Sequence, residues 1–278
     1  MYRSKKVGKD RYCLSSQEVM SAVLRRARLE KDLRRAIGCE EFRVYYQPLV
    51  LLETEETVSF EALLRWEHPE HGLLAPAEFI PLAEKNGFII PLGGWVLREA
   101  CRQLPFLREQ TSSKGPLKMM ANLSPRQFRH PSLVETVAAA LSESGLEPEN
   151  LILEITENTM MEDGATVEVI RRELEGHGVK LALDDFGSGC SSLASVTKIP
   201  LSVIKIDRAL IAGLDGSSEG SAIVSSMIDF AHALGFTVVA EGVKTAGELA
   251  ELRSLGCEYG QGYWRRPYAL PRRQRIRS

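Results

Sequence analysis

Acidic and amide side chains interrupt several short apolar runs of this sequence, and their types indicate divalent-metal chemistry. The polar residues that stand within or directly after such runs are Glu61, Asn122, Glu154, Glu157, Asp184, Asp185, Lys205 and Glu241. Several carboxylates that share one poorly solvated site cannot all stay ionised without compensation, because nearby like charges drive protonation. A divalent cation supplies that compensation, and oxygen ligands from Asp, Glu and Asn select Mg²⁺, Mn²⁺ or Ca²⁺ over zinc.

The adjacent pair Asp184 and Asp185 could hold two ions. Neighbouring residues of a strand point to opposite faces, but at the end of a strand both side chains can reach the same site. Such a pair could bridge two metal ions, as in enzymes of phosphoryl transfer. A single carboxylate at a strand end is more often a helix cap or a surface group, so the prediction depends on the whole set. The histidines show no paired zinc spacing, which argues against a histidine metal site.

Eight β-rich runs alternate with amphipathic stretches from residue 42 onward. The runs are Phe42–Val50, Val58–Leu64, Leu117–Leu123, Leu151–Ile155, Val179–Leu183, Leu201–Ile206, Phe236–Ala240 and Tyr259–Trp264. The helical stretches include Glu78–Leu82, Trp95–Leu107, Leu133–Leu141, Val167–Leu174, Ala222–Leu234 and Ala246–Leu255. This alternation predicts an α/β fold with a parallel sheet, either an eight-stranded barrel or an open doubly wound sheet. In a barrel, the carboxyl ends of the strands converge on one mouth, where the polar residues would meet.

Composition limits the class of protein. The chain has 278 residues, 44% of them hydrophobic, which suits one barrel or two modest domains. A net charge of −2 gives no argument for binding a nucleic acid polymer. Five cysteines without a close-spaced pair argue against a disulfide framework and indicate a reducing, cytoplasmic location. No apolar stretch approaches the roughly 20 residues that a membrane span needs, so neither a span nor a signal peptide is expected.

The order of the motifs resembles the EAL phosphodiesterases over about residues 42 to 268. The matching segments are Glu61-Ala62-Leu63 followed by Leu64-Arg65-Trp66, Asn122-Leu123-Ser124-Pro125-Arg126-Gln127-Phe128, Glu154-Ile155-Thr156-Glu157, Asp184-Asp185-Phe186-Gly187, Lys205-Ile206-Asp207, Glu241-Gly242-Val243 and Gln261-Gly262-Tyr263. The resemblance implies a TIM-like (β/α)8 barrel with one irregular or antiparallel strand. It also implies hydrolysis of cyclic di-GMP, a bacterial second messenger, to linear pGpG.

The resemblance further implies a role for each site residue. Two ions, Mg²⁺ or Mn²⁺, would be held in each active site: the first by Glu61, Asn122, Glu154 and Asp184, and the second by Asp184, Asp185 and Glu241. Lys205 would orient or deprotonate the attacking water, with Gln261 as its helper and as a substrate contact. Arg65 would contact a phosphate, and Glu157 would anchor the loop after Asp185. With Lys205 and Gln261, Glu61 and Glu241 complete the predicted catalytic set.

Three positions depart from the family pattern: Ser188 and Cys190 stand where Thr and Tyr are common, and Lys244 replaces a usual Glu. None of them removes a predicted metal ligand. The main alternative is a cyclic di-GMP receptor without useful turnover, although receptors of that kind usually lose ligands. A further alternative is an unrelated metal-dependent barrel that acts on small carboxylic acids.

The first residues suggest a larger parent protein. Residues 1 to 12 resemble the end of a GGDEF diguanylate cyclase domain, which often precedes an EAL domain. We therefore expect residues 1–40 to be a remnant of that domain with a linker and a capping helix, and residues 41–278 to be the EAL barrel. The resemblance also implies a homodimer and an upstream GGDEF domain. The upstream sensor, and any membrane anchor there, lie outside this sequence.

Overall fold

A computed structural model describes residues 20–21, 23–36, 38–111, 113, 115–161, 165–188, 196, 201–214 and 218–262. The segment that resembles a GGDEF domain, Cys190, Tyr263 and the rest of the C-terminus lie outside the described residues. The chain forms two compact units. The smaller unit joins Met1–Arg43 to Leu64–Ile89, and the larger unit joins Val44–Leu63 to Ile90–Ser278.

Eight strands close into a barrel. They are β1 (Phe42–Leu51), β2 (Thr57–His68), β4 (Lys118–Asn122), β5 (Leu151–Thr156), β6 (Lys180–Phe186), β7 (Val203–Ile206), β8 (Thr237–Val243) and β9 (Tyr259–Gly262). The strand order is β1-β9-β8-β7-β6-β5-β4-β2, and a pairing of β1 with β2 closes it. Strand β1 runs antiparallel to β9. The other consecutive pairs in this order, from β2–β4 to β8–β9, are parallel. The predicted barrel with one antiparallel strand is therefore confirmed, and the open sheet is excluded.

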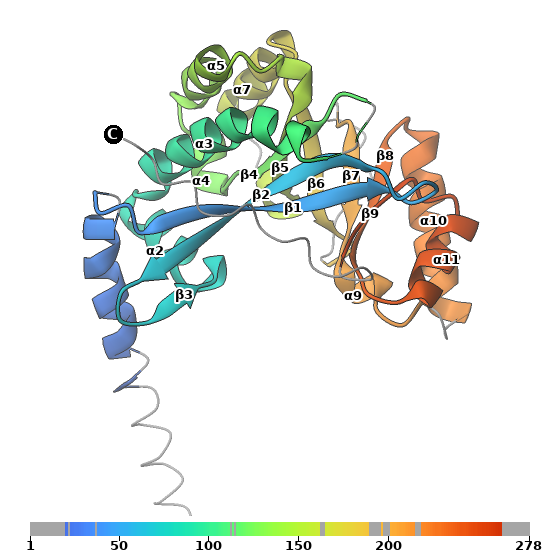
Figure 1. Cartoon of the computed structure of the whole chain (residues 1–278), viewed down its shortest axis with the longest axis horizontal. Helices are drawn as coiled ribbons and strands as arrows, with labels where there is room; N and C mark the ends of the chain where they lie inside the picture. Colours follow the sequence, from blue (N-terminus) through green and yellow to red (C-terminus); the bar gives the residue numbers. More distant parts are fainter. Residues whose placement is uncertain are drawn as a thin grey trace, which may run out of the picture. The chain divides into compact units, whose positions relative to one another are not determined.

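Helices cover the outside of the barrel strands. The helical segments between the strands are α3 (Ile89–Glu109), α4 (Pro125–Phe128), α5 (Leu133–Ser144), the 3₁₀ turn η1 (Pro148–Asn150), α6 (Glu157–Met161), α7 (Ala165–Gly176), α9 (Arg208–Ile211), α10 (Ser218–Ala233) and α11 (Ala246–Ser254). Figure 1 shows α5 and α7 outside strands β4 to β6, and α10 and α11 outside β8 and β9. Side chains such as Leu104, Leu153 and Ile228 form the core between the two layers.

A second, smaller apolar cluster fills the barrel interior. It consists of Leu49, Met120, Ile152, Ala182, Val203 and Val239, with Tyr259 packed against it. Because both faces of each strand are buried, the strands read as continuous apolar runs in the sequence. Because side chains alternate along a strand, the residue two positions after each of these points into the same interior. For five strands that residue is polar: Asn122, Glu154, Asp184, Lys205 and Glu241.

Gly262 is required where β8 meets β9. It pairs with Val243, and a Cβ on Gly262 would lie 1.9 Å from the carbonyl oxygen of Val243. We therefore expect Gly262→Ala to destabilise the protein by about 1–3 kcal/mol, because backbone rather than a flexible side chain must move. Urea denaturation measures the change. Gly115→Ala is the matched control, since nothing lies within 4 Å of its added Cβ. Equal stability of the two variants would contradict the prediction.

The smaller unit contains a helix over residues 20–36, of which residue 22 is not described, the short strand β3 (Gly72–Leu74) and helix α2 (Pro76–Asn86). The indole of Trp66 packs 5.5 Å from the ring of Phe42 and donates a hydrogen bond to Glu41 at 2.9 Å. Strand β3 pairs antiparallel with β2. Strand β3 is not among the predicted runs, because three residues are too few to show a periodic pattern.

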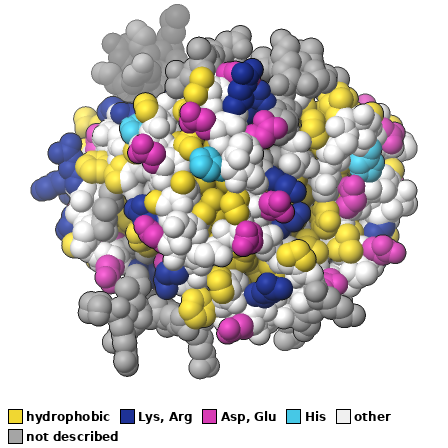
Figure 2. Space-filling view, turned by 90° about the horizontal axis from the view of Figure 1, so that it is seen from above, with side chains coloured by type: hydrophobic (Ala, Val, Ile, Leu, Met, Phe, Trp, Pro, Cys, Tyr) yellow, Lys and Arg dark blue, Asp and Glu magenta, His cyan; other side chains and the backbone are white. Residues whose placement is uncertain are grey.

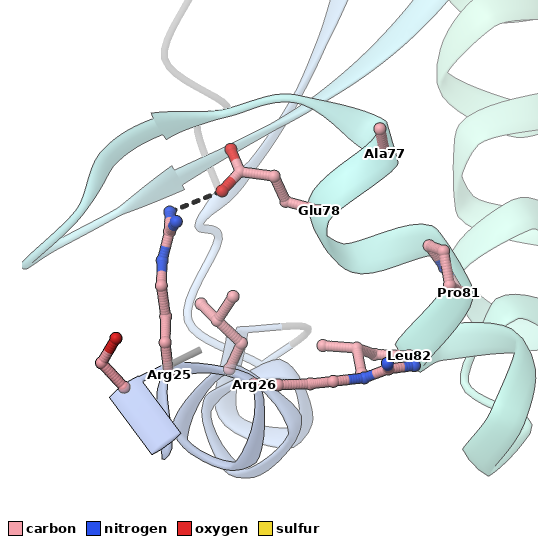
Figure 3. A pocket seen from close by; sticks show the side chains of 8 residues that line it. Arg25, Arg26, Ala77, Glu78, Pro81 and Leu82 are labelled. Carbon is pink, nitrogen blue, oxygen red and sulfur yellow. Dashed lines mark hydrogen bonds and ion pairs between the residues drawn. The ribbon is translucent and has the colours of Figure 1, made fainter. Parts of the chain in front are cut away.

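A cavity of about 520 Å³ lies in the smaller unit, between the helix over residues 20–36 and α2. Figure 3 shows the ion pair of Arg25 with Glu78 beside this cavity. None of the lining residues belongs to the predicted site, so this cavity is not the candidate active site.

The charges on one face of the surface are of both signs, and the described helices include none that could span a membrane. On the face drawn in Figure 2, Lys and Arg are interspersed with Asp and Glu. A search of the described helices finds none that is both long and apolar enough to cross a bilayer.

Candidate active site

Four carboxylates from four strands surround the ammonium group of Lys205. The Nζ atom of Lys205 lies 2.6 Å from Glu241 Oε1, 2.9 Å from Glu154 Oε1, 3.2 Å from Asp184 Oδ1 and 3.3 Å from Glu61 Oε2. The Lys205 side chain is 1% exposed, and that of Glu154 is fully buried. The predicted convergence of strand-end residues is therefore present in the structure, with Lys205 at its centre.

Two amide side chains fix the orientation of Glu61. Asn122 Nδ2 donates to Glu61 Oε1 at 2.7 Å, and Gln261 Nε2 donates to Glu61 Oε2 at 2.6 Å. These residues come from β4 and β9, which are far apart in the sequence. Both oxygens of Glu61 thus have donors, which restricts its rotation.

Asp184, Asp185 and Glu241 form a second cluster of oxygen ligands. One carboxylate oxygen from each of them lies within 4.8 Å of the others. Asp185 adopts a left-handed backbone with φ of 55°, and the β6–β7 register shifts between Leu183 and Phe186. A regular strand would point Asp184 and Asp185 to opposite faces, so this irregular backbone is what brings both carboxylates to one site.

The pKa values show how strongly the charges interact. Burial raises the pKa of Glu154 well above its usual range, and the neighbouring Glu61 raises it further. Burial, with the charge of Asp184, raises the pKa of Glu241 to about 7 although Lys205 opposes the change. Burial also opposes ionisation of Glu61, but Lys205 and two hydrogen-bond donors outweigh it and lower its pKa. The pKa of Lys205 is raised well above its usual range, because the four carboxylates outweigh its burial.

The residues fit a divalent cation. The mouth holds one lysine and five carboxylates, those of Glu61, Glu154, Asp184, Asp185 and Glu241. A divalent ion would neutralise this excess of negative charge. Within the described part of the chain, Glu154 Oε2 and Gln261 Oε1 are buried without a hydrogen-bond partner. All candidate ligand atoms are oxygens, the donor type of Mg²⁺ and Mn²⁺.

The structure places the remaining predicted residues as follows. Glu157 begins α6, and its Oε1 accepts a hydrogen bond of 3.1 Å from the backbone N–H of Gly187. Arg65 belongs to the smaller unit, and its Nη1 donates to the carbonyl of Leu64. The loop-anchor role of Glu157 and the phosphate-contact role of Arg65 stay predictions.

Asp207 contributes to the site although it is not among the predicted site residues. Its side chain caps α9 by accepting from the N–H of Ala209 at 2.7 Å. Its charge also adds to burial and to Asp184 in raising the pKa of Asp185. The Lys-Ile-Asp spacing at a strand end was the available signal, because it places Asp207 beside the same mouth.

Fold and site together define an α/β barrel with a candidate divalent-metal centre at the carboxyl ends of its strands. A family model described as EAL domain matches residues 30–267. The chain therefore belongs to the EAL domain family.

Two curated relatives come from Pseudomonas aeruginosa. The chain is 41% identical over 263 residues to MucR, a bifunctional diguanylate cyclase/cyclic di-GMP phosphodiesterase, with 95% of this chain and 38% of MucR covered. It is 38% identical over 272 residues to the cyclic di-GMP phosphodiesterase NbdA, with 97% of this chain and 34% of NbdA covered. The chain thus spans little more than a third of the length of these relatives.

Two solved structures are also similar. The PaMucR phosphodiesterase in its c-di-GMP complex superposes with a TM-score of 0.79 at 43% identity, covering 85% of this chain and 95% of that chain. The EAL enzyme Bd1971, bound to cAMP and cyclic di-GMP, gives a TM-score of 0.81 at 33% identity, covering 93% of this chain and 70% of that chain.

Proposed function

We propose that this chain hydrolyses cyclic di-GMP to linear pGpG with the help of divalent metal ions, Mg²⁺ or Mn²⁺. The observation that carries the proposal is the complete set of carboxylates around Lys205 at one mouth of an EAL barrel. The names of MucR and NbdA support the substrate, since both are called cyclic di-GMP phosphodiesterases. A homodimer and an upstream GGDEF domain, in a cytoplasmic part of a larger bacterial signalling protein, belong to the same proposal.

Each carboxylate has a proposed ligand role. Glu61, Asn122, Glu154 and Asp184 would hold one ion, and Asp184, Asp185 and Glu241 would hold a second. Bound there, such ions lower the pKa of water and neutralise the charge that develops on the phosphate. Asp184 is common to both sets, so it ties the two positions together.

Lys205 supports the site by position and charge. Its Nζ lies within 3.3 Å of four carboxylates, beside the proposed metal positions, where it would orient or deprotonate the attacking water. Gln261 donates one amide hydrogen to Glu61, and its buried Oε1 accepts from no described residue. That oxygen is therefore suited to accept a hydrogen bond from the attacking water or from the substrate. Arg65 is proposed to contact a phosphate.

The decisive experiment is chromatographic. Purified protein is incubated with cyclic di-GMP and Mg²⁺ or Mn²⁺, with a chelator and with Glu61→Ala as controls. Linear pGpG that forms only with metal and with wild-type protein is the expected result. Tight binding of cyclic di-GMP in calorimetry without product would replace the enzyme by a receptor.

Glu157 is proposed to anchor the segment after Asp185. Removal of its carboxylate by Glu157→Ala leaves the N–H of Gly187 without its acceptor. We expect hydrogen exchange of the Gly187 amide to accelerate by about tenfold or more, since a typical hydrogen bond contributes about 1 kcal/mol and one to a charged group more. Amide exchange read by NMR or mass spectrometry is the measurement.

Glu147→Ala is the control for this loop experiment, because the Glu147 side chain makes no capping hydrogen bond at η1. Unchanged exchange at Gly187 in Glu157→Ala would remove the anchor role.

A further inference from the structure

We propose that Arg208 binds the phosphodiester group of the substrate that is not being cleaved. The inference rests on the proposed function and adds a substrate contact to it. A cyclic dinucleotide carries two phosphodiester groups, each with one negative charge. Only one of them can lie at the carboxylate cluster during a given cleavage, so any contact to the other must come from residues outside that cluster.

Arg208 stands at the rim of the carboxylate-lined mouth. Strand β7 ends at Ile206, which pairs with Ala240 of β8, and Arg208 begins α9 two residues further on. Gly242 directly follows the proposed ligand Glu241. A Cβ on Gly242 would lie 2.6 Å from the Cβ of Arg208 and 3.8 Å from its Cδ. The aliphatic part of Arg208 therefore lies against the backbone next to the site.

The backbone that carries Arg208 is held in place. Asp207 caps α9 through the N–H of Ala209, and its own N–H donates to the carbonyl of Phe186 at 3.2 Å. Gly242 has φ of 67°, a conformation that favours glycine, and its missing side chain leaves room for Arg208. The position of Arg208 thus follows from both neighbouring strands.

Besides Arg65, Arg208 supplies a positive charge that is available for a phosphate. Lys205 is 1% exposed and its ammonium group already contacts four carboxylates, so it cannot reach a second phosphate. Arg208 is exposed, and no residue in the described ranges forms an ion pair or a side-chain hydrogen bond with its guanidinium. A guanidinium can bind two phosphate oxygens at once, which suits it to a phosphodiester.

Steady-state kinetics on cyclic di-GMP with Mn²⁺ tests this contact. We expect Arg208→Ala to raise KM about tenfold or more, with kcat within about threefold of wild type, because a charged hydrogen bond is lost in ground and transition states alike. The KM of Arg208→Lys should lie between those of wild type and Arg208→Ala, because lysine keeps the positive charge. Arg172→Ala is the control, because Arg172 is an exposed arginine on α7 that pairs with Glu168. An unchanged KM in Arg208→Ala, or a loss confined to kcat, would overturn the contact.

Product inhibition identifies the phosphate. Linear pGpG keeps the uncleaved phosphodiester, whereas GMP has only a terminal phosphate. The inhibition constant of pGpG should therefore rise in Arg208→Ala by a factor similar to KM, while that of GMP stays the same. Equal increases for both inhibitors would assign Arg208 to the cleaved group instead and overturn the proposal.

Two further measurements separate the possible failures. Thermal unfolding checks that Arg208→Ala folds, and Arg208→Gln replaces it if its unfolding temperature falls. If wild-type protein binds cyclic di-GMP without hydrolysing it, calorimetry on the same variants tests Arg208 while the proposed hydrolysis fails. If wild-type protein does not bind cyclic di-GMP, both proposals fall together.

Discussion

Asp184→Ala is expected to lower kcat for cyclic di-GMP by about 10³-fold or more. Asp184 contributes to both carboxylate groups of the site, because its Oδ1 lies 3.2 Å from Lys205 and it also clusters with Asp185 and Glu241. Its loss would therefore weaken both proposed metal positions at once. Metal ions supply several kcal/mol of transition-state stabilisation, and each 1.36 kcal/mol corresponds to about a tenfold change in rate.

Stability measurements separate this effect from misfolding. Removal of one of several crowded carboxylates relieves like-charge repulsion, so Asp184→Ala should be at least as stable as wild type in the presence of a chelator. Added Mn²⁺ should then stabilise the variant less than it stabilises wild type, because the variant binds the ion more weakly. Glu143→Ala, a change at an exposed carboxylate in the last turn of α5, serves as the control for both measurements. Wild-type turnover by Asp184→Ala would refute the metal assignment.

Strand and helix positions could be predicted from the sequence because both faces of the barrel strands are buried. All eight predicted runs overlap with strands, and the polar residues that interrupt them meet at one mouth. Closure of the sheet could not be read from the sequence, because it depends on the pairing of β1 with β2 and on the antiparallel pairing of β1 with β9. These contacts between strands leave no periodic signal.

The spacing of the site residues in the sequence does not predict the detailed geometry of the site. Asp adopts a left-handed backbone more often than most non-glycine residues, so the residue type permits this conformation at Asp185 but does not specify it. The sequence identified Lys205 as a positive charge near the metal ligands. It did not show that the ammonium group contacts four carboxylates, since each contact joins residues from different strands.

The contacts of Lys205 make it a structural counterion as well as an active-site residue. Its Nζ lies within 3.3 Å of four carboxylates that are otherwise poorly solvated. Removal of one partner from a buried ion pair costs about 3–5 kcal/mol, because it leaves an uncompensated buried charge. Some of the carboxylates can take up protons, as the raised pKa values of Glu154 and Glu241 indicate, which limits the loss.

Lys205→Met should therefore destabilise the protein, by at most about 3–5 kcal/mol, when no divalent ion is present. Methionine keeps most of the side-chain volume, so the change isolates the charge. Saturating Mn²⁺ should recover part of the stability, because it restores positive charge among the carboxylates, and the gain should exceed that of wild type. Urea denaturation with a chelator and with Mn²⁺ gives both quantities, with Lys31→Met, at an exposed lysine of the smaller unit, as the control. If Lys205→Met were as stable as wild type in the chelator, the four carboxylates would not depend on this lysine, and its role would be confined to the reaction.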